Sequence, residues 1–164
     1  VLLDELLQAQ DQVDDVLGHH IGGGSLAAEE HRHRALGYPG IVELLQKMRE
    51  NNVKAAVLSN KPDNMTCYIA EKLFTGLFDV VHGQREGVPK KPNPSAALLL
   101  CEELGVTPAE CLYVGDSGVD MQTGQNAGLF TAGVTWGFRD EKELEENGAD
   151  TLVHNAEELE NLIL

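Results

Sequence analysis

The sequence predicts a protein of the α/β class, in which a parallel sheet is covered by helices on both faces. Short apolar runs alternate with amphipathic segments from Gly40 to Leu164. The apolar runs show no clean alternation of polar and apolar residues, which is typical of strands that are buried on both faces. A strand, a helix and a second strand at this spacing form a right-handed unit, so we expect the strands to run parallel.

The helices are predicted from apolar residues that recur at helical spacing and from residues that begin or end a helix. In residues 41–51, for example, Leu44, Leu45 and Met48 fall on one face. Gly105 and Gly128 end two of the later helices. The predicted helices span residues 41–51, 63–73, 94–104, 119–127, 141–146 and 156–163, and the predicted strands span residues 53–58, 78–81, 111–114, 130–134 and 151–153.

The first part of the chain has a different pattern. Residues 2–17 have helical spacing, residues 22–25 form a flexible Gly-Gly-Gly-Ser break, and residues 26–36 are a charged helix candidate. We therefore divide the chain into a helical accessory segment, residues 1–36, and an α/β core, residues 37–164. The accessory segment is either a reduced cap or a linker, and the sequence leaves both interpretations open.

The composition disfavours several classes of function. The net charge of −15 argues against binding to nucleic acids and to anionic membranes, because their phosphates would repel the protein. A small phosphorylated substrate stays compatible with this charge if a local lysine and a metal ion override the overall field. The three cysteines have no CxxC spacing, which is typical of reduced thiols and favours the cytoplasm.

A polar pair follows the first predicted strand of the core. Ser59 and Asn60 come directly after residues 53–58. A hydroxyl group and backbone N–H groups at the end of a strand, just before a helix, can bind phosphate oxygens. The alternative is an ordinary turn that only begins the next helix.

A lysine precedes the first of two closely spaced prolines further along the chain. Pro92 keeps Lys91 out of a helix, and Pro94 begins the next one. A lysine fixed in this way can neutralise a phosphoryl group as a point charge. The alternative is an exposed basic loop, although the chain has only twelve Lys and Arg residues in all.

Two carboxylates flank the start of another predicted helix. Asp116 lies just before this helix and Asp120 lies in its first turn. Both then crowd the carboxyl end of one strand, which is where an open α/β sheet binds its ligands. Two close carboxylates repel each other unless a cation neutralises them, and their oxygens suit Mg²⁺. The alternative is a strand-to-helix turn with a capping Asp and a solvated Asp.

These three clusters, in this order, are also found together in a known family. Over residues 37–153 the chain resembles the haloacid dehalogenase superfamily, and within it the phosphoglycolate-phosphatase-like enzymes, whose core is a Rossmann-like sheet. The stretches that carry the resemblance are Tyr38-Pro39-Gly40-Ile41, Val57-Leu58-Ser59-Asn60-Lys61-Pro62, Phe78-Asp79-Val80-Val81, Gly83-Gln84-Arg85, Lys91-Pro92-Asn93-Pro94, Tyr113-Val114-Gly115-Asp116-Ser117, Asp120-Met121, Ala127-Gly128 and Val134-Thr135-Trp136-Gly137.

The resemblance implies a Mg²⁺-dependent phosphomonoesterase that acts on a small phosphorylated metabolite. Ser59 would match the hydroxyl that holds the phosphoryl group, with Asn60 beside it. Lys91 would match the lysine that steadies the nucleophile and the phosphate. Asp116 would match a direct Mg²⁺ ligand, and Asp120 would support the metal, either as a ligand or through another group. Asn60, Lys61 and Ser117 are the less specific matches.

The chain departs from the family at the residues that carry the chemistry. The family begins with an apolar strand and Asp-x-Asp-Gly-Thr, whose first Asp is the nucleophile and whose second is the general acid and base. In the nearest string, residues 1–7, Asp4 would be the nucleophile and Leu6 stands at the acid/base position. Without the family's first strand, the sheet is expected to lack its central member. Since the first residue is Val, we expect a missing or processed N-terminus; the alternatives are lost catalysis or a strand from another chain.

Three functions are therefore open. The first is a phosphoglycolate-phosphatase-like hydrolase that forms an aspartyl-phosphate. The second is a non-catalytic binding protein on the same scaffold, which keeps a pocket for phosphate and Mg²⁺. The third is a haloacid dehalogenase or another hydrolase of the superfamily, which we favour less because Asp116 and Asp120 would make a metal site and the dehalogenases do without metal.

Overall fold

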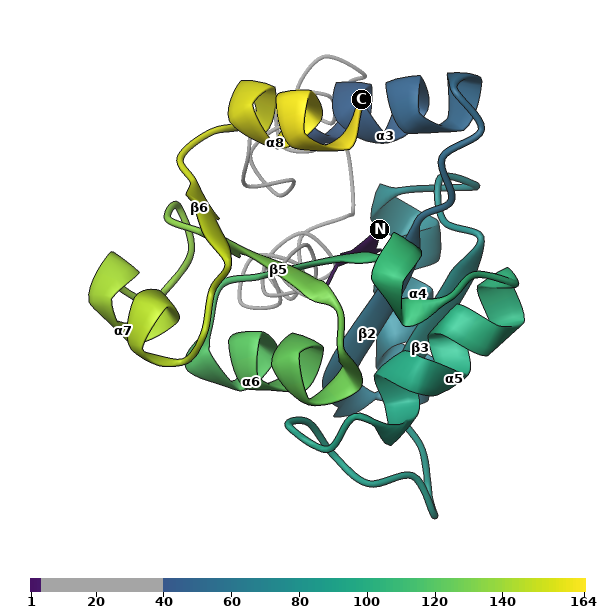
Figure 1. The fold of residues 1–164 in the computed structure, drawn as a ribbon. Helices are drawn as coiled ribbons and strands as arrows, with labels where there is room; N and C mark the ends of the chain where they lie inside the picture. The colour runs from purple at the N-terminus through teal and green to yellow at the C-terminus, as the bar shows by residue number, and fades with distance from the viewer. Residues whose placement is uncertain (4–39) are drawn as a thin grey trace, which may run out of the picture.

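The computed structural model describes residues 1–3 and 40–164. In this part of the chain, six strands form one parallel sheet in the order β3-β2-β1-β4-β5-β6 (Figure 1), which confirms the α/β class. The strands are β1 (Leu2–Leu3), β2 (Ala56–Pro62), β3 (Val80–Gln84), β4 (Leu112–Gly115), β5 (Phe130–Val134) and β6 (Thr151–Val153). The helices are α3 (Ile41–Glu50), α4 (Asp63–Leu73), α5 (Ser95–Leu104), the short 3₁₀-helix η2 (Pro108–Glu110), α6 (Gly118–Ala127), α7 (Glu141–Glu146) and α8 (Ala156–Ile163).

The centre of the sheet is formed by β1, and this corrects the sequence-based expectation. Leu2 and Leu3 were predicted to begin a helix, but they pair with β2 on one side and with β4 on the other. Two consecutive apolar residues are compatible with the spacing of a helix and with that of a strand, so the pattern does not decide between them. A position between two strands satisfies the backbone N–H and C=O groups of these residues on both sides. The sheet therefore has a central strand. The rest of the predicted helix 2–17, the glycine-rich break and the helix candidate 26–36 lie outside the described residues.

Strands β2 and β3 end at Pro62 and Gln84, well beyond the predicted ends at residues 58 and 81. The ladder to neighbouring strands begins at Ala56 in β2 and at Val80 in β3, two or more residues after the start of each apolar run. An apolar run indicates which residues are buried. The bounds of a strand depend instead on where the neighbouring strand can form backbone hydrogen bonds with it. The register between β2 and β3 also shifts between Leu58 and Pro62. Ser59 and Asn60 consequently lie within β2, not after it.

Successive residues of each strand point to opposite faces, and each face is covered by different helices. Val57 and Val114 pack on the face of α3, α4 and α8, among apolar side chains such as Leu45 and Leu159. Ala56 and Tyr113 pack on the face of α5 and α6, with Leu100. Burial of these apolar side chains, at about 25 cal/mol per Å², is the main force that holds the layers together. Figure 1 shows α3 and α8 side by side over their face.

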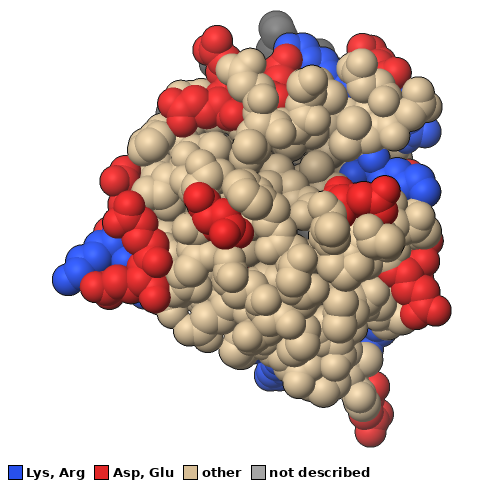
Figure 2. All heavy atoms as spheres, in the orientation of Figure 1, with Lys and Arg blue, Asp and Glu red and all other residues tan. Residues whose placement is uncertain are grey.

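The acidic excess of the chain is visible on its exposed helices. Figure 2 shows Asp and Glu side chains gathered over α7 and α8, while the centre of this face carries few charges. The sequence of α7, EKELEE, accounts for part of this distribution. Among the described residues, no helix has both the length and the apolar character needed to cross a membrane.

Candidate active site

All described strands are parallel, so their carboxyl ends lie along the same edge of the sheet. At this edge, Lys91 from the β3–α5 connection contacts Asp120 in the first turn of α6. The Lys91 Nζ donates a hydrogen bond to the Asp120 Oδ1 over 2.6 Å. The two side chains are only 4% and 0% exposed. Two of the predicted site residues therefore form a buried ion pair.

Asp120 is also held by the start of its own helix. Ser117 is the N-cap of α6, and its hydroxyl and backbone N–H donate to the Asp120 Oδ2 over 2.5 and 3.1 Å. This is a capping box with Asp in place of the usual Glu or Gln. Gly115 leaves room for the carboxylate, because a Cβ at position 115 would lie 2.3 Å from the Asp120 Cβ. Both carboxylate oxygens of Asp120 are thus engaged within the protein.

Asp116 directly follows β4 and is 1% exposed. The backbone N–H of Phe138 donates to its Oδ2 over 3.1 Å. The segment after β5 can approach this closely because residue 137 is glycine: a Cβ there would lie 2.3 Å from the Asp116 Cβ. Burial raises the pKa of the Asp116 carboxyl, and the nearby Asp120 raises it further, whereas the Phe138 N–H and the Lys91 ammonium lower it. The site therefore favours a cation or a proton beside this carboxylate.

Ser59 and Asn60 reach the same edge from β2. Ser59 is buried, and its Oγ accepts a hydrogen bond from the backbone N–H of Lys61 over 3.3 Å. The Asn60 amide faces the backbone of Lys91: its Oδ1 accepts from the Lys91 N–H over 3.0 Å, and its Nδ2 donates to the Lys91 carbonyl over 3.4 Å. The structure thus brings Asn60, Lys91 and Asp120 into one chain of contacts.

Sequence reasoning missed some of the groups that shape this edge. Ser117 was recognised only as a less specific match, although the spacing from Ser117 to Asp120 is itself a readable capping pattern. Gly137 belongs to a stretch that carries the family resemblance, but the sequence assigned it no role. Its close approach to Asp116 and the hydrogen bond from the Phe138 N–H both depend on how the segment after β5 folds back over β4.

Of the two carboxylates at this edge, Asp116 is better suited than Asp120 to bind a magnesium ion. Within residues 1–3 and 40–164, no three His, Cys, Asp or Glu side chains are grouped so that they could hold a metal ion. Mg²⁺ commonly takes only one or two carboxylates, with water and substrate oxygens completing its octahedron. Asp116, a buried carboxylate with a raised pKa, suits such a role. Asp120 suits it less, because Lys91 and Ser117 already occupy its two oxygens.

Comparison with known proteins identifies related chains. The family model for haloacid dehalogenase-like hydrolases matches residues 3–128. A phosphoglycolate phosphatase of Pseudomonas putida is 32% identical over 128 residues, which are 77% of this chain and 47% of that protein. One from Aquifex aeolicus is 36% identical over 102 residues, or 62% of this chain and 48% of that protein. The chain thus spans about half the length of these curated relatives.

Solved structures agree with the sequence comparisons. A proposed phosphoglycolate phosphatase of Lactobacillus delbrueckii has a TM-score of 0.74 and 40% identity, covering 77% of this chain and 53% of that one. A predicted phosphatase of Clostridium acetobutylicum has the same TM-score at 18% identity, covering 99% and 96% of the two chains, which shows the shared fold alone. The match of the family model over most of the chain, with the motifs in the expected order, shows that this protein belongs to the haloacid dehalogenase-like hydrolases.

Proposed function

We propose that this protein is a Mg²⁺-dependent phosphomonoester hydrolase that acts in the cytoplasm on a small phosphorylated metabolite of the phosphoglycolate type. The observation that carries the proposal is the buried Lys91–Asp120 pair beside Asp116, at the carboxyl edge of a parallel sheet. A buried, oriented ammonium group is costly to maintain, and a transferring phosphoryl group is the kind of charge that it could stabilise. The relatives named phosphoglycolate phosphatase support the substrate class.

In this proposal the predicted residues divide three tasks among them. The Lys91 ammonium and the Ser59 hydroxyl hold the phosphoryl oxygens, and Asp116 holds the metal, with Asp120 orienting Lys91. Mg²⁺, when bound, would neutralise negative charge on the phosphoryl group. Phosphoryl transfer needs little covalent chemistry from the protein, so that placement of charge carries most of the rate.

The nucleophile of the proposed reaction is Asp4, which lies outside the described residues. Its support is the position of β1: Leu3 pairs with Val57 of β2 and with Val114 of β4, and Asp4 is the next residue in the sequence. Two residues beyond those partners, the neighbouring strands reach Ser59 and Asp116. In the reaction, an Asp4 oxygen attacks phosphorus and the bond from phosphorus to the alcohol oxygen breaks, with that oxygen taking a proton from water. A water molecule then attacks the phosphorus of the aspartyl-phosphate, which releases phosphate and restores the Asp4 carboxylate.

Phosphate release from phosphoglycolate and from p-nitrophenyl phosphate tests this function, with Mg²⁺ and with EDTA. We expect release that depends on Mg²⁺ and is abolished in Asp116→Asn and Asp4→Asn, while both variants stay folded by circular dichroism. Unchanged turnover in Asp116→Asn would contradict the metal assignment. Release by Asp4→Asn at the wild-type rate would contradict the assignment of the nucleophile.

A second candidate function is a non-catalytic protein that binds phosphate on the same scaffold. Leu6 at the family's acid/base position favours it, because an apolar side chain cannot move the proton that hydrolysis of the intermediate requires. A folded chain that binds inorganic phosphate with Mg²⁺ in calorimetry but releases none from either substrate would support this candidate over the hydrolase.

A further inference from the structure

We propose that Asn60, assisted by Asn126, is a positioning residue that fixes the main chain at Lys91 and so aims the Lys91 ammonium group. The inference rests on the proposed function, in which Lys91 holds the phosphoryl group. It gives Asn60 a different task from the one that the sequence suggested, which was direct contact with substrate. The site would then depend on a pair of asparagines that act through the lysine.

The contact between Asn60 and Lys91 is reciprocal. The Asn60 Oδ1 accepts from the Lys91 N–H over 3.0 Å, and the Asn60 Nδ2 donates to the Lys91 carbonyl over 3.4 Å. Both polar atoms of the Asn60 side chain therefore bind the backbone of the same residue. This pairing imitates a rung of a sheet between β2 and a segment that has no strand of its own. The second Nδ2 proton of Asn60 is not used in this pairing, so the kinetic test below has to separate positioning of Lys91 from direct contact with a phosphate oxygen.

The next residue, Pro92, is held by a different element. The Asn126 Nδ2 donates to the Pro92 carbonyl over 2.9 Å, and Asn126 lies on α6, the helix that also carries Asp120. The corner at Lys91 and Pro92 is therefore anchored to β2 through Asn60 and to α6 through Asn126. The ammonium end of Lys91 is fixed to α6 as well, by Asp120.

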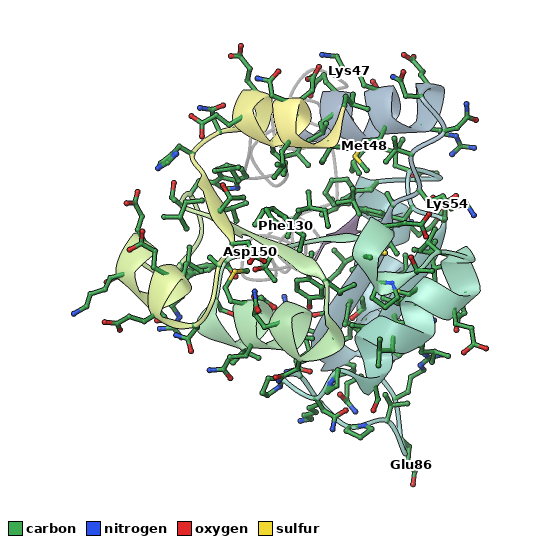
Figure 3. The ribbon with its side chains drawn as sticks, viewed as in Figure 1. Lys47, Met48, Lys54, Glu86, Phe130 and Asp150 are labelled. Atoms are coloured by element: carbon green, nitrogen blue, oxygen red, sulfur yellow. The ribbon has the colours of Figure 1, made fainter. Side chains whose placement is uncertain are left out.

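The path of the chain explains why such anchoring matters. Between β3 and α5 the connection projects from the body of the molecule, with Glu86 near its tip (Figures 1 and 3). The chain must return from this projection to place Lys91 in a buried position. The Lys side chain is a flexible stem, so any shift of its backbone is passed on to the charged end. Displacements of about 1 Å in a positioned group can cost roughly 100-fold in rate.

Kinetics of Asn60→Ala and Asn126→Ala, with p-nitrophenyl phosphate as the probe, separate positioning from substrate binding. We expect Asn60→Ala to lower kcat by about 10- to 100-fold with little change in KM, because the ammonium is misplaced where charge develops. Asn126→Ala should lower kcat in the same way but less. A rise in KM at unchanged kcat in Asn60→Ala would overturn the proposal, since it would identify a substrate ligand.

Asn155→Ala is the matched control. Asn155 caps α8 by accepting from the Glu158 N–H over 2.9 Å, and it has no contact with the site residues among the described part of the chain. Its loss should lower the unfolding temperature while leaving kcat unchanged. A fall in kcat in Asn155→Ala comparable to that in Asn60→Ala would mean that general destabilisation explains both, and would overturn the positioning role.

A measurement that does not need turnover keeps this inference separate from the proposed function. In ¹⁵N NMR, an ammonium buried against Asp120 exchanges its protons slowly enough to be seen, and the signal of Lys91 is assigned by its absence in Lys91→Arg. We expect the signal in the wild type and its loss in Asn60→Ala. If the wild type hydrolyses nothing, the function fails while this test still stands; if the signal persists unchanged in Asn60→Ala, the positioning role fails.

Discussion

Two lysine–carboxylate pairs in this protein have the same length and different surroundings. Lys91–Asp120 at the carboxyl edge and Lys47–Glu160 between α3 and α8 both measure 2.6 Å. The side chains of the first pair are 4% and 0% exposed, and those of the second are 51% and 31% exposed. Figure 3 shows Lys47 pointing away from the sheet, while its neighbour Met48 points toward it. Distance alone therefore says little about what a pair contributes.

The difference lies in the cost of removing each charge from water. A solvated pair costs little to form and contributes little, typically up to about 1 kcal/mol. A buried pair loses several kcal/mol of hydration for each ion and recovers it only if the geometry is good and the remaining lone pairs are satisfied. Ser117 supplies that satisfaction for Asp120. Because burial of this kind seldom improves stability, the Lys91–Asp120 pair is better explained by chemistry at the site.

The largest effect is expected from breaking the buried pair. Lys91→Ala leaves Asp120 charged and buried without its ammonium partner, which should lower the free energy of unfolding by about 3–5 kcal/mol. It should also abolish phosphate release. Urea unfolding followed by circular dichroism measures the first effect, and a loss below about 1 kcal/mol would contradict the energetic difference between the two pairs.

The double variant Lys91→Ala with Asp120→Asn is the control for that prediction. It removes both charges while Asn can still accept the hydrogen bonds from Ser117. We expect it to recover most of the stability that Lys91→Ala loses, with activity still absent. A double variant as unstable as Lys91→Ala would show that lost packing of the lysine stem, and not an isolated charge, causes the effect.

The second carboxylate of the carboxyl edge, Asp116, gives a pH-dependent test. Its pKa is raised in the folded protein, chiefly by burial, so the folded state holds a proton that the unfolded state releases as pH rises above the ordinary value of 3.8. This contribution to stability is present below 3.8 and is lost as pH rises through the raised pKa. Without divalent cations, the stability of Asp116→Asn relative to the wild type should therefore increase with pH across this window. A relative stability that decreases with pH would contradict the direction of the shift.

The smallest effect is expected at the exposed pair. Lys47→Ala should change the free energy of unfolding by less than about 1 kcal/mol, because water and salt already screen this contact. The difference from the wild type should shrink further in 1 M NaCl, where charges are screened within roughly 3 Å. Chemical denaturation with urea at low and high salt measures it, and activity should be unaffected. If Lys47→Ala lowered the free energy of unfolding as much as Lys91→Ala, the buried and the exposed pair would not differ in energy as we infer.

Much of the secondary structure could be predicted because its signals are local. The helix over Asp63–Leu73 and the strand over Phe130–Val134 have the bounds that the sequence predicted. Pro62-Asp63 begins the first, and Gly128 precedes the second. The prediction was wrong where the secondary structure depends on pairing with distant strands. Leu2 and Leu3 were expected in a helix, and they form a strand because β2 and β4 flank them.

In the candidate site, too, the local features could be predicted and the long-range contacts could not. Spacing along the chain predicted that Asp116 and Asp120 would lie at one strand end, and both do. It could not predict that Asp120 faces Lys91, because that contact joins residues 29 positions apart. Nor could it distinguish Asn60 as a substrate ligand from Asn60 as a partner of the Lys91 backbone, since both need an amide at that position.

By itself, the sequence determined the α/β class, the order of the polar clusters and the family, because helix caps, apolar runs and short motifs are properties of neighbouring residues. Only the tertiary structure decided the central place of β1, the burial of the Lys91–Asp120 pair and the raised pKa of Asp116. These properties depend on which strands meet and on how much water they exclude. Hydration and Coulomb energies vary with surroundings far more than with residue type, and the fold sets the surroundings.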